Sequence, residues 1–306
     1  MTEDHGESDV FMVVKTPAGN HCRTRYNQRE IDTIREEILP KLKEDEISNM
    51  GVIAPYNNQA DAIRAQLNLE SSTVHKFQGK ERDIILLSTT DNQVTEFSDD
   101  SHLLNVAISR AKNKLIVVTT GNDIAKGSNL SDLLGYIEYN GFEIHQGNVN
   151  SIFDCLYSNY NQTLKNRFGG KDTISRYESE NIMYRLLLDV LALPEYSALQ
   201  VLFEIPLKDI LGYELKKSLS NDELLYAVDD WTHVDFAIFN KLTKRLVCVV
   251  EVDGYAYHKK GTKQNERDAM KNRILEKAGI IYERFSTVGS GEKERIIALI
   301  EKSLKN

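Results

Sequence analysis

Residues 71–88 read Ser71-Ser-Thr-Val-His-Lys-Phe-Gln-Gly-Lys-Glu-Arg-Asp-Ile-Ile-Leu-Leu-Ser88, and this stretch decides the fold of the N-terminal half. A polar cluster lies directly before an apolar run that is typical of a buried strand. Burying polar groups beside such a strand costs free energy, so their presence indicates a functional role. Two further stretches also join apolar to polar residues: Gly51-Val-Ile-Ala-Pro-Tyr-Asn-Asn-Gln59 and Leu104-Asn-Val-Ala-Ile-Ser-Arg-Ala-Lys112. Each of the three stretches thus predicts a strand or helix that adjoins a functional turn.

The N-terminal half alternates predicted strands with predicted helices. Apolar runs predict strands at 10–14, 50–54, 71–74, 83–88 and 114–119, and helical spacing predicts helices from Asn27 and over 57–67 and 101–111. Asn27 and Glu30 have the spacing of a capping box. Because alternating strands and helices form parallel sheets covered on both faces, we expect residues 1–150 to be one α/β domain.

In order and spacing the three stretches resemble motifs IV, V and VI of superfamily 1 helicases of the Upf1/Dna2-like group, over residues 10–145. The resemblance implies a RecA-like domain in which Arg110 is the motif VI arginine finger, whose guanidinium stabilises charge on a transferring phosphoryl group. It places Gly79 and Glu81 in the motif V turn near the nucleotide. It also implies that Gln59, at the start of a helix, faces the same cleft.

The same resemblance implies a path for nucleic acid. Thr73 and His75 match residues that touch the nucleic-acid backbone, and Tyr56 offers a ring on which a base can stack. One position departs from the pattern, because many relatives have arginine where this chain has Leu103. We therefore expect one anion contact fewer than in those relatives.

A complete motor also needs a phosphate-binding loop that ends in Gly-Lys-Ser/Thr. The most similar stretch, Gln78-Gly-Lys-Glu81, lacks the upstream glycine and the hydroxyl residue of that loop. The sequence before this stretch also contains no apolar strand that ends in Asp-Glu, the pair that would bind Mg²⁺. The sequence thus predicts the second RecA-like domain of a motor. ATP is expected to bind only together with a first RecA-like domain or helicase subunit as partner.

The second half, residues 151–306, predicts a different α/β arrangement. After an N-terminal linker helix near 151–165, the pattern predicts a helix at 177–193, strands at 199–205, 234–239 and 246–252, a helix at 263–278, a strand at 280–285 and a helix at 291–303. This set is too short for another RecA-like domain.

Four carboxylates fall at informative places in this half. Glu251 and Asp253 end one predicted strand on the same face, Asp235 lies near the start of the strand before it, and Glu180 lies on the preceding helix. Converging carboxylates repel one another and are stable chiefly when a hard divalent cation neutralises them. We therefore predict a Mg²⁺ or Mn²⁺ site with these four ligands, which is the requirement of a metal-dependent phosphodiesterase.

The same half resembles the PD-(D/E)xK nucleases, particularly restriction-endonuclease-like and very-short-patch-repair-like domains, over residues 175–303. The matching pattern is Glu251-Val-Asp-Gly254, His258, Arg267-Asp268, Lys271 and Gly279. The position of the usual lysine is Asp253, so two alternatives stay open. Either a lysine has migrated, with Lys271, Lys259 and Lys263 as candidates, or His258 and Asp253 activate the water.

We therefore expect the C-terminal portion of a helicase–nuclease that acts on DNA in repair, restriction or phage defence, with RNA left open. Two alternatives remain: an inactive nuclease fold that only binds DNA, and a docking platform for a separate motor subunit.

Composition limits the possible classes of protein. The chain has 41% hydrophobic and 27% charged residues, which is typical of globular proteins. Its net charge of −8 argues against a protein that binds nucleic acid through a generally basic surface. Nucleic-acid contacts must therefore come from local patches. The three cysteines match neither a zinc site nor a disulfide framework, and no apolar run is long enough to span a bilayer. We expect a cytoplasmic protein without membrane contact.

Overall fold

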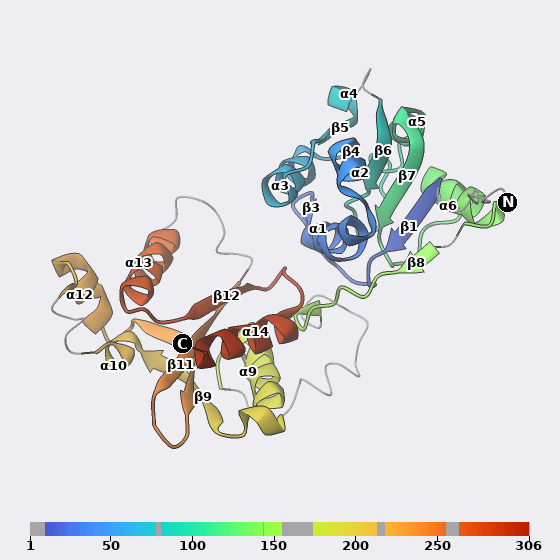
Figure 1. Cartoon of the computed structure of the whole chain (residues 1–306). Helices are drawn as coiled ribbons and strands as arrows, with labels where there is room; N and C mark the ends of the chain where they lie inside the picture. The colour runs from blue at the N-terminus through green and yellow to red at the C-terminus, as the bar shows by residue number, and fades with distance from the viewer. Residues whose placement is uncertain are drawn as a thin grey trace. The chain divides into compact units, whose positions relative to one another are not determined.

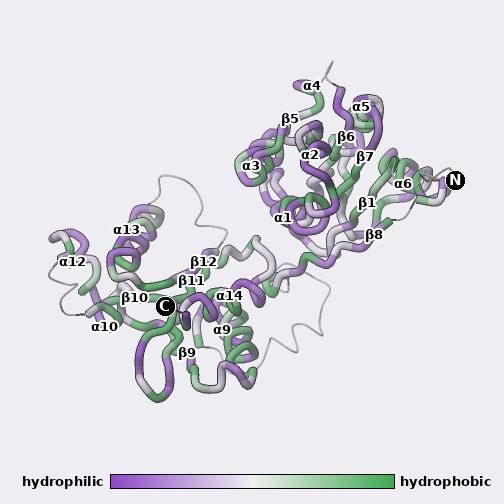
Figure 2. The backbone as a smooth tube through the Cα atoms, viewed as in Figure 1, coloured by the Kyte–Doolittle hydropathy of each residue, from purple (hydrophilic) through white to green (hydrophobic). Residues whose placement is uncertain are grey.

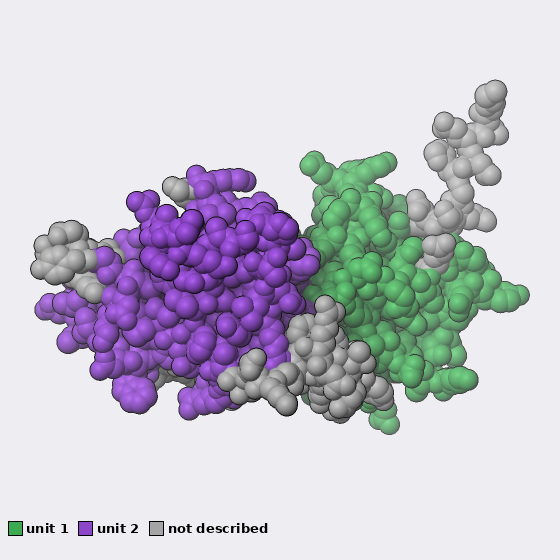
Figure 3. All heavy atoms as spheres, turned by 90° about the horizontal axis from the view of Figure 1, so that it is seen from below, with its two compact units in different colours: residues 1–150, 157–160 green, residues 151–156, 161–306 purple. Residues whose placement is uncertain are grey.

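The computed structural model describes residues 10–77, 81–142, 144–154, 174–212, 218–254 and 263–305, with side chains from 266 in the last range. The chain divides into two compact units, residues 1–150 with 157–160 and residues 151–156 with 161–306 (Figure 3). Each unit has its own sheet and helices (Figure 1). This confirms the predicted mixed α/β fold.

Unit 1 is built on a six-stranded sheet in the order β5-β4-β6-β7-β1-β8, in which all described pairings are parallel. The strands are β1 (Phe11–Lys15), β4 (Met50–Ala54), β5 (Ser71–Thr73), β6 (Arg82–Ser88), β7 (Ala111–Thr119) and β8 (Ile144–Gln146). A short hairpin, β2 (Cys22–Arg23) and β3 (Tyr26–Asn27), lies outside this sheet. The arrangement is the RecA-like parallel sheet that the alternation of strands and helices predicted.

Two hydrophobic clusters cover the two faces of the sheet. In β6, Ile85 and Leu87 belong to one cluster, and Ile84 and Leu86 belong to the other. Alternate residues of a strand point to opposite faces, so a strand buried on both sides is apolar throughout. In Figure 2 the inner strands of this sheet include hydrophobic segments, and the helices around them carry both hydrophobic and hydrophilic residues.

The helices of unit 1 divide between these faces. The first cluster includes residues of α4 (Val74–Phe77), α5 (Ser101–Arg110) and α6 (Asn129–Tyr139), and the second includes residues of α1 (Gln28–Thr33), the π-helix at Ile34–Ile38 and α3 (Asn57–Leu67). A 3-10 turn at Leu39–Lys41 and α2 (Glu44–Ser48) connect to β4.

The N-terminus of α1 is capped differently from the prediction. Asn27 is the N-cap and accepts a hydrogen bond from the backbone N–H of Glu30. The Glu30 side chain, however, does not return to Asn27. It is fully buried and accepts hydrogen bonds from Thr90 N (2.9 Å) and from the hydroxyls of Ser88 and Thr89 at the end of β6. The capping-box prediction is therefore correct for Asn27 and wrong for Glu30.

Unit 2 contains a four-stranded sheet in the order β12-β11-β10-β9. The strands are β9 (Leu199–Pro206), β10 (His233–Asn240), β11 (Leu246–Asp253) and β12 (Tyr282–Ser286). β10 is antiparallel to both β9 and β11, whereas β12 is parallel to β11. The parallel pair requires a crossover, and α13 (Lys263–Lys277) forms it.

Helices lie on both faces of this sheet. α9 (Glu178–Leu191) and α14 (Glu292–Leu304) contact each other and β11, and Tyr184 of α9 stacks on Phe236 of β10. On the other face, Ile274 and Leu275 of α13 share a core cluster with Val249 of β11, to which α10 (Leu207–Ile210) and α12 (Asn221–Val228) also contribute. A 3-10 turn at Pro194–Tyr196 precedes β9.

Among the described residues no helix has the length and apolar character needed to cross a membrane. Most of the predicted linker helix, near 151–165, lies outside the described residues.

Candidate functional site

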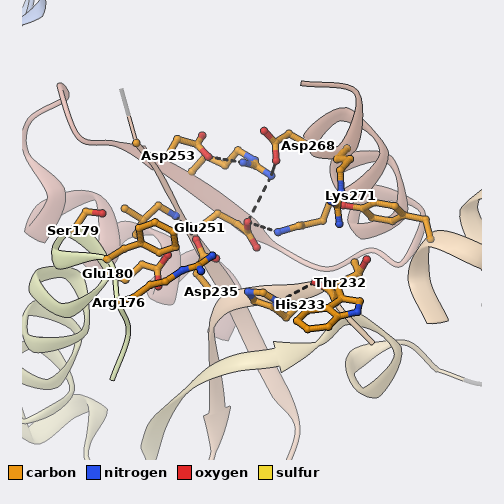
Figure 4. Close-up of a pocket in the computed structure, with 17 residues that line it drawn as sticks. Arg176, Ser179, Glu180, Thr232, His233, Asp235, Glu251, Asp253, Asp268 and Lys271 are labelled. Atoms are coloured by element: carbon orange, nitrogen blue, oxygen red, sulfur yellow. Dashed lines mark hydrogen bonds and ion pairs between the residues drawn. The ribbon is translucent and has the colours of Figure 1, made fainter. Parts of the chain in front are cut away.

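A cavity of about 490 Å³ opens at one end of the unit 2 sheet, beside α13 and the start of α9 (Figure 4). Its lining combines acidic, basic and aromatic side chains. The lining residues are Arg176, Tyr177, Ser179, Glu180, Tyr226, Trp231, Thr232, His233, Asp235, Glu251, Val252, Asp253, Gly254, Arg267, Asp268, Lys271 and Arg284.

Strand pairing aligns three charged residues in one row across the sheet. The antiparallel register Phe236↔Val250 makes Asp235 and Glu251 the next opposed pair, and the parallel register pairs Glu251 with Arg284. Asp235 is fixed further, because Val252 N donates a hydrogen bond of 2.7 Å to its Oδ2. The row therefore lies on a rigid sheet rather than on loops.

Lys271 reaches this row from α13. Its Nζ lies 2.7 Å from Glu251 Oε2, and the side chains of Lys271 and Glu251 are only 12% and 3% exposed. Figure 4 shows Lys271 pointing at Glu251 from the α13 side, with Glu180 on the opposite side. Of the three lysines considered in the sequence, Lys271 is thus in the site. Lys259 and His258 lie outside the described residues, as does the side chain of Lys263.

Arg284 is a site residue that the sequence reasoning missed. Its Nη1 donates to Asp253 Oδ1 at 2.6 Å, and its Nη2 lies 3.6 Å from both Glu251 Oε2 and Asp268 Oδ1. The available signal was an arginine inside an otherwise strand-like segment, Tyr282–Ser286, but only the register of β12 on β11 identifies its partners.

The two central carboxylates are held in an unfavourable environment. Burial, followed by the proximity of Asp235, raises the pKa of Glu251 to about 7 although Lys271 opposes this change. Burial likewise raises the pKa of Asp235 to about 6. For Lys271 burial disfavours the charge, but Glu251 and Asp235 outweigh it and raise its pKa. Lys271 is therefore a cation at neutral pH, beside carboxylates that its charge does not fully stabilise.

The predicted set of four metal ligands is not assembled. Over the part of the chain that the structure describes, no group of three or more Asp, Glu, His or Cys side chains is close enough to hold a metal ion. Asp253 is paired with Arg284, whose charge stabilises this carboxylate. Glu180 lines the cavity, and burial raises its pKa.

Asp235 and Glu251 nevertheless fit a hard divalent cation. Glu251 Oε1 is buried and has no hydrogen-bond partner among the described residues, while its Oε2 contacts Lys271. Mg²⁺ commonly takes one or two protein carboxylates and completes its shell with water and substrate phosphates. Two carboxylates with a free, buried oxygen meet that requirement.

In unit 1 the motif residues divide between two edges of the sheet. The register Arg82↔Ala111 places Glu81 and Arg110, one residue earlier in each segment, at the same edge. Arg110 Nε is buried and has no hydrogen-bond partner among the described residues, and Glu81 lies 3.8 Å from Lys112. Gly79 lies outside the described residues.

The opposite edge of this sheet carries the residues predicted to contact nucleic acid. Thr73 ends β5 and pairs with Ala54, which ends β4, so Thr73 and Tyr56 both lie at the carboxyl ends of neighbouring strands. The Tyr56 hydroxyl donates to Asp91 (2.9 Å), and its ring stacks on Phe97 with a centroid distance of 5.2 Å. Phe97, which is 56% exposed, was missed because no pattern distinguishes it in its loop.

Three further observations concern the predicted residues of unit 1. His75 lies exposed in the short helix α4. Arg25 lies over the Tyr56 ring, 5.3 Å from its centroid. Gln59 is fully buried, with its amide bonded to the backbone of Asn27 and to Ser88 Oγ. The prediction that Gln59 faces a nucleotide cleft is therefore wrong, because all its polar atoms serve the core.

In the comparison with known proteins, the two halves of the chain match two different families. Residues 5–122 match a family described as an AAA domain, and residues 176–303 match one described as a protein of unknown function (DUF2726). The latter description assigns no activity.

The similar proteins are helicases. The DNA replication ATP-dependent helicase/nuclease dna2 of Schizosaccharomyces pombe is 33% identical over 117 residues, 35% of this chain and 8% of that protein. DNA polymerase alpha-associated DNA helicase A of Saccharomyces cerevisiae is 36% identical over 107 residues, 31% of this chain and 16% of that protein. An uncharacterized ATP-dependent helicase of Methanocaldococcus jannaschii is 36% identical over 102 residues, 32% of this chain and 15% of that protein. The matches support a superfamily 1, Dna2/Upf1-like helicase part, although the chain spans less than a fifth of each relative.

Proposed function

We propose that unit 2 is a metal-dependent phosphodiesterase that cuts DNA, joined to a RecA-like helicase part. The observation that carries the proposal is the convergence of Asp235, Glu251 and Lys271, from two strands and a helix, in one cavity. Two acidic residues with a nearby lysine are the minimum that the PD-(D/E)xK resemblance requires. Lys271 replaces the lysine whose usual position is Asp253.

Each residue has a distinct role in this proposal. Asp235 and Glu251 would hold the divalent ion, which supplies charge neutralisation at the phosphate and a more acidic bound water. Lys271, as a cation, attracts a non-bridging phosphate oxygen and stabilises the charge that develops on it. A raised pKa makes Lys271 a poor general base, because a base must be deprotonated at the working pH. Arg284 positions Asp253 and neutralises it.

Unit 1 contributes half of an ATP site in this proposal. Arg110 and Glu81 lie at the edge of the sheet where a first RecA-like domain would dock, and the unpaired Nε of Arg110 leaves a donor for a phosphate. The opposite edge, with Tyr56, Phe97 and Thr73, is available for a nucleic-acid strand. ATP hydrolysis then requires the missing phosphate-binding loop from a partner domain.

The test is Mn²⁺ binding by calorimetry together with nicking of supercoiled plasmid in Mg²⁺ without ATP. Asp235→Ala and Glu251→Ala should abolish both, whereas Lys271→Ala should abolish nicking and leave most of the Mn²⁺ binding. Lys277→Ala is the matched control, because Lys277 lies on the same helix and pairs with Glu223 at 2.7 Å but does not line the cavity. If Mn²⁺ binding does not depend on Asp235, the nuclease proposal fails.

One observation favours a second candidate, an inactive fold that only binds DNA. Lys271 and Arg284 already satisfy Oε2 of Glu251 and Asp253 as internal ion pairs. Ion pairs of this kind neutralise the two carboxylates without a metal. Binding of DNA without cutting in Mg²⁺ or Mn²⁺ would select this candidate.

A further inference from the structure

Trp231 is 82% exposed and is the single tryptophan of the chain. A tryptophan side chain buries 150–250 Å² of surface in a typical protein, so one left in solvent forgoes a large stabilisation. It also lines the cavity that holds Asp235 and Glu251. The ring is therefore an unusual feature at the entrance of the proposed active site.

The backbone beneath this ring is fixed. Trp231 N donates to Asp229 Oδ1 and Thr232 N donates to Asp229 O, both at 3.0 Å. Leu207 N donates to Thr232 O at 2.9 Å, and His233 Nδ1 lies 3.2 Å from the carbonyl oxygen of Trp231. The loop thus presents an exposed ring at a defined place, which lowers the entropic cost of a contact made there.

Trp231 lies in the turn that directly precedes β10, the strand that carries Asp235. Trp231, His233, Asp235 and Glu251 all line the same cavity. A base on Trp231 would therefore lie in the cavity that also holds the two carboxylates.

The rest of the lining suits a nucleic-acid backbone. Arg176 and Arg267 line the same cavity as Lys271 and provide cations for phosphate groups. An indole ring accepts any base, because every base has a π-face, but only when the base is not already stacked in a duplex.

We propose that Trp231 stacks on an unpaired nucleobase of the strand that enters the cavity, so that the substrate is single-stranded or locally unpaired nucleic acid. This inference rests on the proposed nuclease function and adds its substrate class. Another reading is that Trp231 belongs to an apolar protein-docking patch with Leu225 and Val228, which are 68% and 43% exposed. Those two residues do not line the cavity, whereas Trp231 does, so the nucleobase is favoured.

Because Trp231 is the single tryptophan, its fluorescence reports on this position alone in the full chain. The probes are a short single-stranded DNA, the matching blunt duplex and an abasic oligonucleotide of equal length, all in EDTA so that no cutting occurs. Single-stranded DNA should quench the emission strongly, and the abasic oligonucleotide should not. Leu225→Ala, at an exposed residue that does not line the cavity, should leave this quenching unchanged.

The second measurement is the affinity for labelled single-stranded DNA, determined by fluorescence anisotropy. It is made in a Tyr56→Ala background so that stacking in unit 1 contributes little to binding. Trp231→Ala should weaken binding about ten-fold or more, Trp231→Phe should restore most of it, and Leu225→Ala should have no effect. Equal quenching by the abasic oligonucleotide, or equal losses in Leu225→Ala and Trp231→Ala, would overturn the inference. Cutting without quenching refutes the stacking alone. Quenching without metal-dependent cutting refutes the nuclease activity alone.

Discussion

Replacing Glu30 by Gln tests the physical account of unit 1 most directly. Glu30 is fully buried between α1 and the end of β6, and burial raises its pKa to about 8 in spite of hydrogen bonds from Ser88, Thr90 and Thr89. In the unfolded chain its pKa is the ordinary value of 4.5. The folded state therefore holds this proton more tightly than the unfolded state does.

The sign of the pH dependence follows from this difference. The stabilising effect of the protonated form is complete below the unfolded pKa and is lost as the pH rises through the folded pKa of about 8. Each unit of pKa difference corresponds to 1.36 kcal/mol, so the free energy of unfolding of unit 1 should fall by about 4 kcal/mol between pH 5 and pH 9. Gln is nearly isosteric with protonated Glu and does not titrate. Glu30→Gln should cost up to about 1 kcal/mol at pH 5 and stabilise unit 1 by about 3 kcal/mol at pH 9.

The assay is urea unfolding at pH 5, 7 and 9, followed by circular dichroism and by tryptophan fluorescence. Fluorescence reports on unit 2, which contains Trp231, and should not respond to Glu30→Gln. Glu44→Gln, at an exposed position of α2, is the matched control and should follow the wild type at every pH. The reasoning is refuted if unfolding of the wild-type unit 1 is independent of pH, or if Glu30→Gln loses stability at pH 9.

Three further predictions concern the sites. The chain assayed alone should not turn over ATP. After a first RecA-like domain is added and ATP turnover is restored, Arg110→Ala should lower kcat on the order of 10³-fold. The control variant Arg64→Ala should leave kcat unchanged. Phe97→Ala should weaken binding of single-stranded DNA to unit 1 by about 1 kcal/mol or more, measured by anisotropy in a Trp231→Ala background, and a paired duplex should show no such change. Glu251→Gln should abolish nicking and weaken Mn²⁺ binding, because the amide lacks the carboxylate charge that a divalent cation requires. Equal Mn²⁺ affinity in this variant and the wild type would contradict the assignment of Glu251.

The sequence predicted the structure well where the interacting residues are close together in the sequence, and poorly where they are far apart. The central strands β6 and β7 were predictable because parallel strands buried on both faces are continuous apolar runs, and this signal is local. The burial of Gln59 was not predictable, because its hydrogen-bond partners Asn27 and Ser88 lie about thirty residues away on either side in the sequence. A polar residue in the first turn of a helix that follows a strand is readily interpreted as a cleft residue until the packing of that helix, here α3, is known.

The candidate site divides in the same way. Asp235 and Glu251 were predictable, because strand alternation and adjacency suffice to bring them together. The pairing of Asp253 with Arg284 was not predictable, because no local pattern in the sequence indicates it. That pairing depends on the register of β12 on β11, which places Arg284 opposite Glu251.

Helix α13, which forms the crossover between β11 and β12, places Lys271 beside Glu251, which is where the migrated-lysine alternative requires a lysine. Lys271 approaches Glu251 from outside the sheet and contacts Oε2, which leaves the buried Oε1 without a partner among the described residues. One carboxylate thus offers separate oxygens to a lysine and to a divalent cation. An ion bound at Oε1 and Asp235 would not need to displace Lys271, and both positive charges would face the same phosphate. This division of one carboxylate is the reason to expect that Lys271→Ala retains metal binding while it abolishes cutting.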